Sequence, residues 1–199
     1  MRVLVACEYS GVVRRAFRER GHDTWSCDLL PADDGPSIWH HQKDIRDLLE
    51  TPFGRGFDLM IAHPPCTHLA VSGARWFKDK AEEQKKALDF VQMLMNAPIP
   101  RIAIENPVSV ISSHIRKPDQ IVQPYMFGDP FTKTTCLWLK NLPLLVPTDV
   151  VDKGKRHVTK SGKSLPEWYN LPPSEDRWKI RSQTFQGFAN AMADQWGRL

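Results

Sequence analysis

The sequence predicts an α/β fold built on a mostly parallel, doubly wound sheet. Three short apolar runs, "RVLVAC", "FDLMIA" and "RIAIENP", alternate with segments of helical periodicity. Strands that alternate with helices in this way form parallel sheets covered by helices on both faces. With 199 residues, 41% of them hydrophobic and 25% charged, the chain has the size and composition of one globular domain over residues 1–199.

The first elements form a β-α-β unit. "RVLVAC" predicts the first strand, and apolar residues then recur at helical spacing from Val12 to Phe17, before Gly21 stops the helix. "HDTWSCDLL" predicts the second strand, which ends near Asp28, and "PADDGPS" predicts the loop after it.

Two further strands bring polar residues to one edge of the sheet. "FDLMIA" predicts the third strand, with "HPPC" directly after it, and a helix follows from about Asp79 to Asn96 with an apolar face. "RIAIENP" repeats the pattern of an apolar strand that leads into a polar loop. Because ligands bind at the carboxyl ends of parallel strands, we expect both loops at one ligand-binding edge. "TTCLWLK" and a last helix in "SQTFQGFANAMADQW" complete the domain.

Residues 147–176 interrupt this pattern and predict an irregular basic insertion. The segment is rich in proline, glycine and charge, and its cations lie near Trp168 and Tyr169. Such a loop can contact phosphates and stack on a base, although a solvated surface loop is an equally good interpretation. The cations are Lys153, Lys155, Arg156, Lys160 and Lys163.

The bulk properties favour a cytoplasmic protein without membrane contact. "MRVLVACEYS" has too short an apolar core for a secretory signal, and no apolar run approaches the roughly 20 residues of a membrane span. The four cysteines are therefore expected as free thiols. A net charge of +4 permits an anionic partner but does not identify one.

The first turn, "ACEYSGVVRRAF", is where a nucleotide-like cofactor would sit, against the helix N-terminus. Its candidate residues are Glu8, Tyr9, Ser10 and Gly11. Asp28, at the end of the second strand, is a candidate acceptor for ribose hydroxyls. An ordinary tight turn and a solvated loop acid are the alternatives.

Cys66 follows two prolines, which stiffen the loop and can hold a thiol in one position. The thiol is then either a nucleophile or a small buried filler. His63 and His68 also suggest zinc, but three such close ligands without a fourth make a poor site, and we expect no metal. Similarly, Glu105 and Asn106 form either an acid–base site with a raised pKa or a structural cap.

Taken together, the motifs resemble those of the DNA cytosine-5 methyltransferases, in a compact, phage-like form. The matching stretches, in order, are "CEYSGVVRRAF", Asp28, "KDIRDL" with Asp44, "HPPCTHLA", "IENP" and "QGFANAMADQW" with Asn190. They cover most of residues 2–140 and again 177–196. The resemblance implies a Rossmann-like domain that binds S-adenosylmethionine, with Asp28 at the ribose, Asp44 at the adenine and Asn190 also on the cofactor.

The resemblance further implies methyl transfer to carbon-5 of cytosine. Cys66 would add to carbon-6 of the base, while Glu105, with Asn106 in the same motif, would hold N3 and the exocyclic amine. Lys133, in "FTKTTCLWL", stands where the family usually carries arginines near the pyrimidine O2. A base in duplex DNA would have to flip out to reach Cys66.

Substrate contacts are expected from the nucleophile loop, at Pro64 and Pro65, and from the insertion, at Lys155 and Arg156. The family's separate target-recognition domain is reduced to residues 147–176. A partner protein that supplies target recognition is therefore one expectation. The same chemistry on a cytosine nucleotide or RNA, or transfer of another one-carbon group, is an alternative. A catalytically silent nucleic-acid-binding subunit is a third, although such a protein needs neither Cys66 nor Glu105.

Overall fold

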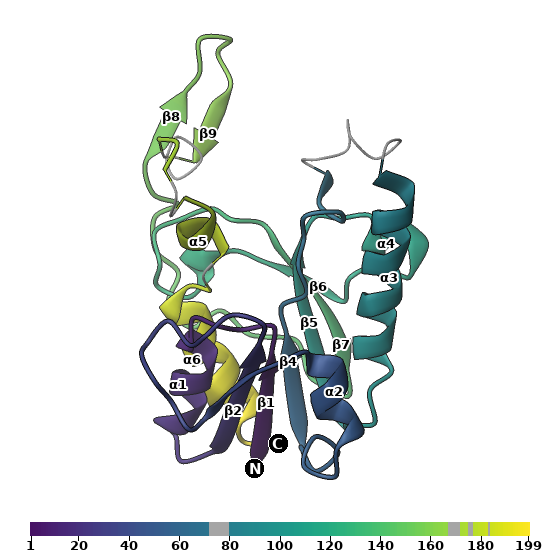
Figure 1. Cartoon of the computed structure of the whole chain (residues 1–199). Helices are drawn as coiled ribbons and strands as arrows, with labels where there is room; N and C mark the ends of the chain where they lie inside the picture. Colours follow the sequence, from purple (N-terminus) through teal and green to yellow (C-terminus); the bar gives the residue numbers. More distant parts are fainter. Residues whose placement is uncertain (72–79, 167–171, 175–176, 183) are drawn as a thin grey trace.

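The computed structural model describes residues 1–71, 80–166, 172–174, 177–182 and 184–199, with one seven-stranded mixed sheet covered by helices on both faces (Figure 1). A separate pair of strands, β8 and β9, forms a hairpin. The elements in chain order are β1 (Arg2–Ala6), α1 (Val12–Arg18), β2 (Asp23–Asp28), β3 (His40–Gln42), α2 (Ile45–Glu50), β4 (Leu59–Ala62), α3 (Ala81–Met95), β5 (Arg101–Pro107), α4 (Ile111–His114), β6 (Gln120–Val122), the 3-10 helix η2 (Pro124–Met126), β7 (Thr135–Lys140), β8 (Arg156–Val158), β9 (Ser164–Pro166), α5 (Arg177–Ser182) and α6 (Gln186–Trp196).

The sheet has the strand order β3-β2-β1-β4-β5-β7-β6, and the first five of these strands are parallel. The predicted α/β class with a mostly parallel sheet is therefore confirmed. The strand β7 differs, because it runs antiparallel to both β5 and β6. Only a loop and the short helix η2 connect β6 to β7, and an antiparallel pair needs no longer crossover.

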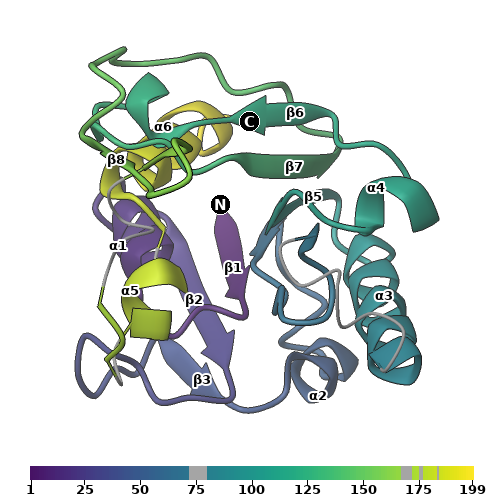
Figure 2. The ribbon, with the colours of Figure 1, turned by 90° about the horizontal axis from the view of Figure 1, so that it is seen from above.

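The alternation of side chains along β1 divides the core into two layers. Val3 and Val5 pack on the face covered by α1 and α6, whereas Leu4 and Ala6 pack on the face covered by α2 and α3. All four side chains are fully buried. The view from above shows these two groups of helices on opposite sides of the sheet (Figure 2). Burial on both faces explains why this strand is a continuous apolar run in the sequence.

The strand order reverses between β1 and β4. The chain first winds from β1 through β2 to β3, and then returns so that β4 pairs with the other side of β1. In open α/β sheets ligands bind outside the carboxyl ends of the strands at such a reversal. Two loops begin at this reversal: one starts with Cys7 and Glu8 after β1, and the other starts with His63 and Pro64 after β4.

The segment predicted as an irregular insertion contains an ordered element, the β8–β9 hairpin, which projects beyond the sheet edge (Figure 1). Arg156 fastens the hairpin by donating to Ser164 from Nε at 2.7 Å and from Nη2, to the backbone carbonyl, at 2.8 Å. The expected role of Trp168 and Tyr169 falls outside the described residues, as does Asp79 at the predicted start of the third helix. In the described part of the chain, no helix has the length and apolar character to cross a membrane.

Candidate active site

Cys66 lies in an anchored loop directly after β4. The backbone N–H of His63 donates to Ala6 of β1 at 2.9 Å, which fixes the start of the loop. The carbonyl of Cys66 accepts from the N–H groups of Leu69, at 3.0 Å, and Ala70, at 2.9 Å, which closes a turn behind it. The cysteine itself is exposed. The loop thus presents a thiol on a backbone that is held at both ends.

The other cysteines have a different environment. Burial raises the pKa of Cys7, Cys27 and Cys136, that of Cys27 to about 12. A buried thiol with a raised pKa carries little of the reactive thiolate at neutral pH. Of the four cysteines, all of them in the described part of the chain, only Cys66 is exposed. Its exposure favours the interpretation of Cys66 as a nucleophile over that of a small buried filler.

Glu105 and Asn106 lie within β5 and not in a loop after it, which corrects the sequence prediction. The strand continues to Pro107 because β7 pairs with it antiparallel, with Leu137 opposite Glu105 and Cys136 opposite Asn106. Pairing with β7 therefore holds Glu105 and Asn106, the polar end of "RIAIENP", within the sheet. A rigid strand positions these side chains better than a loop would.

Asn106 joins the β5 end to the nucleophile loop. Its side chain is 1% exposed, and Nδ2 donates to the backbone carbonyl of Pro64 at 2.9 Å. Pro64 is buried as well, whereas Pro65 and Cys66 are exposed. Asn106 therefore fixes the peptide group two residues before the thiol.

Glu105 is paired with His63. Because Ala62 lies opposite Ile104 in the β4–β5 register, the next residues of the two chains come side by side, and His63 Nδ1 lies 2.9 Å from Glu105 Oε2. Burial raises the pKa of Glu105, but the hydrogen bond and charge of His63, together with Lys133, outweigh burial and hold that pKa below its usual value. The raised pKa expected for this acid from the sequence is wrong, because the sequence does not reveal the histidine.

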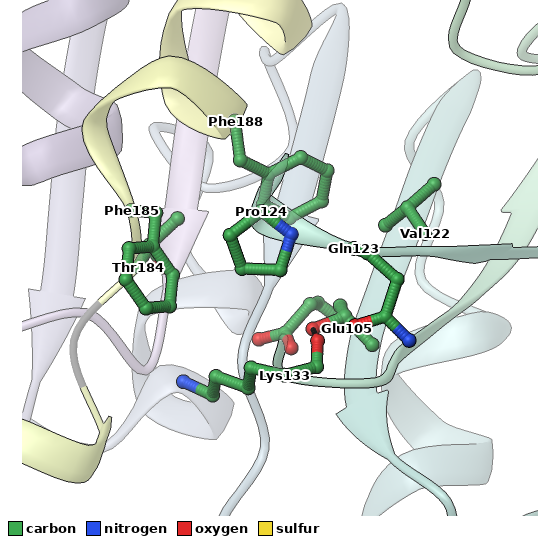
Figure 3. Close-up of a pocket in the computed structure, with 9 residues that line it drawn as sticks. Glu105, Val122, Gln123, Pro124, Lys133, Thr184, Phe185 and Phe188 are labelled. Carbon is green, nitrogen blue, oxygen red and sulfur yellow. Dashed lines mark hydrogen bonds between the residues drawn. The ribbon is translucent and has the colours of Figure 1, made fainter. Parts of the chain in front are cut away.

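Glu105 and Lys133 line one narrow recess of about 10 Å³ (Figure 3). The Nζ atom of Lys133 lies 5.7 Å from the centroid of the Phe185 ring, at the same recess. The structure thus brings together two of the predicted catalytic residues. The other residues that line the recess are Val122, Gln123, Pro124, Thr135, Thr184, Phe185 and Phe188.

A larger cavity of about 480 Å³ lies at the carboxyl ends of β1 and β2. Its wall contains Asp28, Asp44 and Pro65, three residues that sequence analysis assigned to cofactor or substrate. Apolar side chains from α2 and α3, Ile45, Ala87 and Phe90, line it together with the charged side chains of Lys43, Arg46, Glu83 and Lys86. A volume of this size is typical of small-molecule sites.

The two acids of this cavity differ in their surroundings. Burial raises the pKa of Asp28, and its Oδ1 accepts from the N–H of Leu30 at 2.9 Å. Asp44 is the N-cap of α2, because its Oδ1 accepts from the N–H of Arg46 at 2.9 Å. Its hydrogen bond to the Arg46 side chain lowers the pKa of Asp44. Asp44 therefore carries a structural role as well as its place in the cavity wall.

The side chains of the first turn are engaged within the protein. Glu8 is buried, and its carboxylate accepts from the N–H groups of Val13, at 2.6 Å, and Arg14, at 3.2 Å, at the N-terminus of α1. Burial raises the pKa of Glu8. Gly11 has a φ of 69°, the left-handed conformation that glycine adopts most readily. Of the described residues in this turn, Cys7 lines the large cavity, whereas the four predicted cofactor-binding residues from Glu8 to Gly11 do not.

Two groups of contacts that hold this turn, those of Arg14 and of Tyr9, were not predicted from the sequence. Arg14 is buried and donates to Ser26 Oγ at 2.8 Å and to both carboxylate oxygens of Asp34, at 2.6 and 2.5 Å. The hydroxyl groups of Tyr9 and Ser182 lie 3.0 Å apart and connect the turn to α5. The alternation of apolar and charged residues in α1 gave no signal that one arginine points inward.

The remaining predicted positions lie farther from these cavities. Asn190 is on α6, where its Oδ1 accepts from Gln186 Nε2 at 3.1 Å, and that helix packs against α1. Lys155 and Arg156 are exposed at the base of the hairpin. Neither cavity includes any of these three residues in its described wall.

His68 is a further residue of the cavity wall that sequence analysis considered only as a metal ligand. Its Nδ1 is buried and, within the described part of the chain, has no hydrogen-bond partner. The described residues also contain no group of three or more His, Cys, Asp or Glu side chains with the arrangement of a metal site. No protein-family model matches this chain, and no curated protein is significantly similar to it.

Proposed function

We propose that this protein transfers a methyl group from S-adenosylmethionine to carbon-5 of cytosine in DNA, through a covalent adduct on Cys66. One observation carries the proposal: Asn106 of β5 bonds the loop of the exposed Cys66 to the strand of Glu105, beside the cavity lined by Asp28, Asp44 and Pro65. An exposed thiol, a buried carboxylate and a cofactor-sized cavity at one sheet edge support a two-substrate reaction.

The described residues of the cavity fit S-adenosylmethionine. Its volume of about 480 Å³ is in the range for a molecule of this size. Asp28 suits the ribose hydroxyls, and the apolar side chains of Ile45 and Phe90 suit the adenine. When bound, S-adenosylmethionine supplies the methyl group as an electrophile attached to a sulfonium.

Cys66 provides the nucleophile. Carbon-5 of cytosine is a poor nucleophile, and addition of the Cys66 thiolate at carbon-6 forms a carbon–sulfur bond that places electron density on carbon-5. The anchored loop limits the thiol to few positions, so that little ordering is left for the encounter with the base. Carbon-5 then forms a bond to the methyl group, a base such as water takes the proton from carbon-5, and the bond from sulfur to carbon-6 breaks to release the Cys66 thiolate.

Glu105 and Lys133 act on the polar edge of the pyrimidine. The ionised carboxylate of Glu105 accepts a hydrogen bond from the exocyclic amine of cytosine. Its charge and position disfavour a base that lacks this amine. Lys133, which lines the same recess, donates to the pyrimidine O2, where negative charge develops as the thiolate adds. The Glu105 side chain is only 17% exposed, and this partial exclusion of water strengthens its interaction with the base.

DNA is the substrate that the basic hairpin favours. Lys155 and Arg156 are exposed on an element that projects beyond the edge that carries Cys66, in a chain with a net charge of +4. Such cations bind phosphates without reading the sequence. We propose that a partner protein supplies the sequence recognition that the short hairpin lacks, and that the target base is flipped out of the helix.

The direct test combines the protein with S-adenosylmethionine labelled in its methyl group and, in parallel, with duplex DNA, single-stranded RNA or dCMP. Label in carbon-5 of cytosine in DNA is the expected result. Label only in dCMP or RNA would keep the chemistry and replace the substrate. Absence of label from all three substrates contradicts the proposal.

A second test traps the covalent step. Duplex DNA with 5-fluorocytosine cannot lose the group at carbon-5, so the adduct should persist and appear as a slower band in a denaturing gel. Cys66→Ser should abolish the band and leave cofactor affinity unchanged. Cys136→Ala is the matched control, because that thiol is buried, and it should still form the adduct. A trapped peptide that contains another cysteine would overturn the assignment.

A further inference from the structure

His63 makes a direct, largely shielded contact with Glu105. Its Nδ1 lies 2.9 Å from Glu105 Oε2, and the two side chains are only 13% and 17% exposed. The contact bridges the carboxyl ends of the adjacent strands β4 and β5. It is built into the sheet, because the pairing of Ala62 with Ile104 places the following residues side by side.

Several charged groups face this pair from the neighbouring elements. Burial raises the pKa of Glu8, which follows β1, and of Asp28, which ends β2, and the charge of His63 only partly offsets this rise. For Glu105, the hydrogen bond and charge of His63 outweigh burial and lower the pKa. Lys133 lines the same recess as Glu105, and its charge also lowers the pKa of that carboxyl group. Of the three acids, only Glu105 forms a hydrogen bond with the imidazole among the described residues.

The other nitrogen of the ring has no such contact. His63 Nε2 is buried and has no hydrogen-bond partner within the described residues. Nδ1 is therefore the ring nitrogen through which the imidazole contacts a carboxylate, that of Glu105. Histidine is the side chain that gains and loses a proton most readily near neutral pH.

The proposed reaction requires such a proton. When the Cys66 thiolate adds to carbon-6, N3 of the pyrimidine becomes basic and gains a proton. Glu105 has a lowered pKa and is ionised at neutral pH, so it holds no proton of its own to donate. His63 is the side chain that forms a hydrogen bond with the Glu105 carboxylate.

We infer that His63 is the proton store for Glu105: its imidazolium gives the Nδ1 proton to the carboxylate, and the resulting carboxyl group gives a proton to N3 as the adduct forms. The balance is one proton from His63 to N3, with Glu105 unchanged, and the same proton returns when Cys66 leaves. His63 is thus a positioning residue that acts through Glu105. The inference rests on the proposed function and adds a residue that its sequence motif did not include.

The test compares the rate of methyl transfer to DNA, as a function of pH, for the wild type and His63→Asn. Asparagine places an amide donor near the position of Nδ1 but cannot release a proton. If His63 supplies the proton, the wild-type kcat should fall as pH rises. In His63→Asn we expect kcat to fall by about 100-fold and this pH limb to disappear, while KM for DNA stays within about twofold, because proton transfer typically contributes 10²- to 10⁴-fold.

The matched control is His114→Asn, at an exposed histidine of α4 outside both cavities, and it should keep the wild-type profile. A His63→Asn protein with a reduced rate but the wild-type pH limb would show a merely structural role and overturn the inference. A wild-type protein that transfers no methyl group at all would instead overturn the proposed function, which separates the two failures.

A measurement on the wild type makes the test independent of how well the variant folds. Proton NMR titration of the His63 imidazole should show it changing protonation state over the same pH range as kcat. An imidazole that keeps one protonation state throughout that range would overturn the inference.

Discussion

Asn106 Nδ2 donates to the backbone carbonyl of Pro64 at 2.9 Å, so that a side chain of β5 holds the loop that leaves β4. The bond is buried, and it fixes the peptide two residues before Cys66. The bond connects the loop of Cys66 to the strand of Glu105, which is next to Asn106 in the chain. Changes at Asn106 should therefore alter both stability and thiol position.

Asn106→Ala should lower the free energy of unfolding by about 1–3 kcal/mol, because the carbonyl of Pro64 is left buried without its donor. It should also slow the formation of the 5-fluorocytosine adduct, since the loop is then free to move. Urea unfolding and the gel assay measure the two effects. Asn96→Ala, at an exposed position at the end of α3, is the control and should change neither. An unchanged adduct rate in Asn106→Ala would contradict the positioning role.

Glu8 and Glu105 should give opposite pH dependences of stability. The pKa of Glu8 is raised on folding, so its contribution is fully present below the unfolded value of 4.5 and is lost as pH rises through the folded pKa. The pKa of Glu105 is lowered, so its contribution is present above 4.5 and is lost as pH falls through the folded pKa.

The comparison uses Glu8→Gln and Glu105→Gln, unfolded in urea at a series of pH values. The stability advantage of the wild type over Glu8→Gln should shrink as pH rises above 4.5, and its advantage over Glu105→Gln should shrink as pH falls below 4.5. Slopes of the same sign for both variants would show that the environment of one carboxylate has been misassigned.

The buried ion pair of Arg14 should contribute much more to stability than a surface pair. The Arg14 side chain is 3% exposed, so Asp34→Ala leaves a buried guanidinium with Ser26 as its remaining side-chain acceptor. We expect a loss of about 2–4 kcal/mol in unfolding free energy, measured with urea. Asp194→Ala breaks the more exposed pair with Arg20 and should cost less than about 1 kcal/mol. Equal losses in the two variants would contradict this account.

The fold class followed from strands that are buried on both faces, because such strands appear in the sequence as continuous apolar runs. The runs at β1, β4 and β5 fixed the parallel part of the sheet and the edge with the nucleophile loop. The three-residue strands, such as β3 and β8, were not predicted. They are too short and too polar to give a period-2 pattern.

The site was only partly predictable for a related reason. The sequence identifies residues at the ends of strands, but it does not fix the register between strands distant in the chain. The contact of His63 with Glu105 depends on the β4–β5 register, and was therefore missed. Glu8 was assigned to the cofactor, whereas its carboxylate bonds the first amides of α1, since a turn of the chain brings it back onto the helix.

Asp28 provides a test of the cofactor cavity that does not depend on DNA. Asp28→Ala should weaken binding of S-adenosylmethionine by about 10- to 100-fold, because one hydrogen bond to a charged group contributes about 1.5–3 kcal/mol. Isothermal titration calorimetry measures this affinity. Asp47→Ala removes an exposed carboxylate of α2 outside the cavity wall and should bind as the wild type does. Equal affinity in both variants would remove Asp28 from the ribose position.

Lys155 tests whether the hairpin binds the DNA backbone. Lys155 is exposed, whereas the guanidinium of Arg156 is already bonded to Ser164 and holds the hairpin, so Lys155→Ala removes a charge with the smaller structural effect. If this lysine neutralises one phosphate, the plot of log affinity against log salt should become shallower by about 0.9, equally for every DNA sequence. Fluorescence anisotropy at several salt concentrations measures the slope. Lys117→Ala removes the same charge from an exposed position before β6 and should leave the slope unchanged. Parallel slopes for the wild type and Lys155→Ala would exclude this lysine from the DNA contact, whereas a loss confined to one sequence would mean that it reads a base.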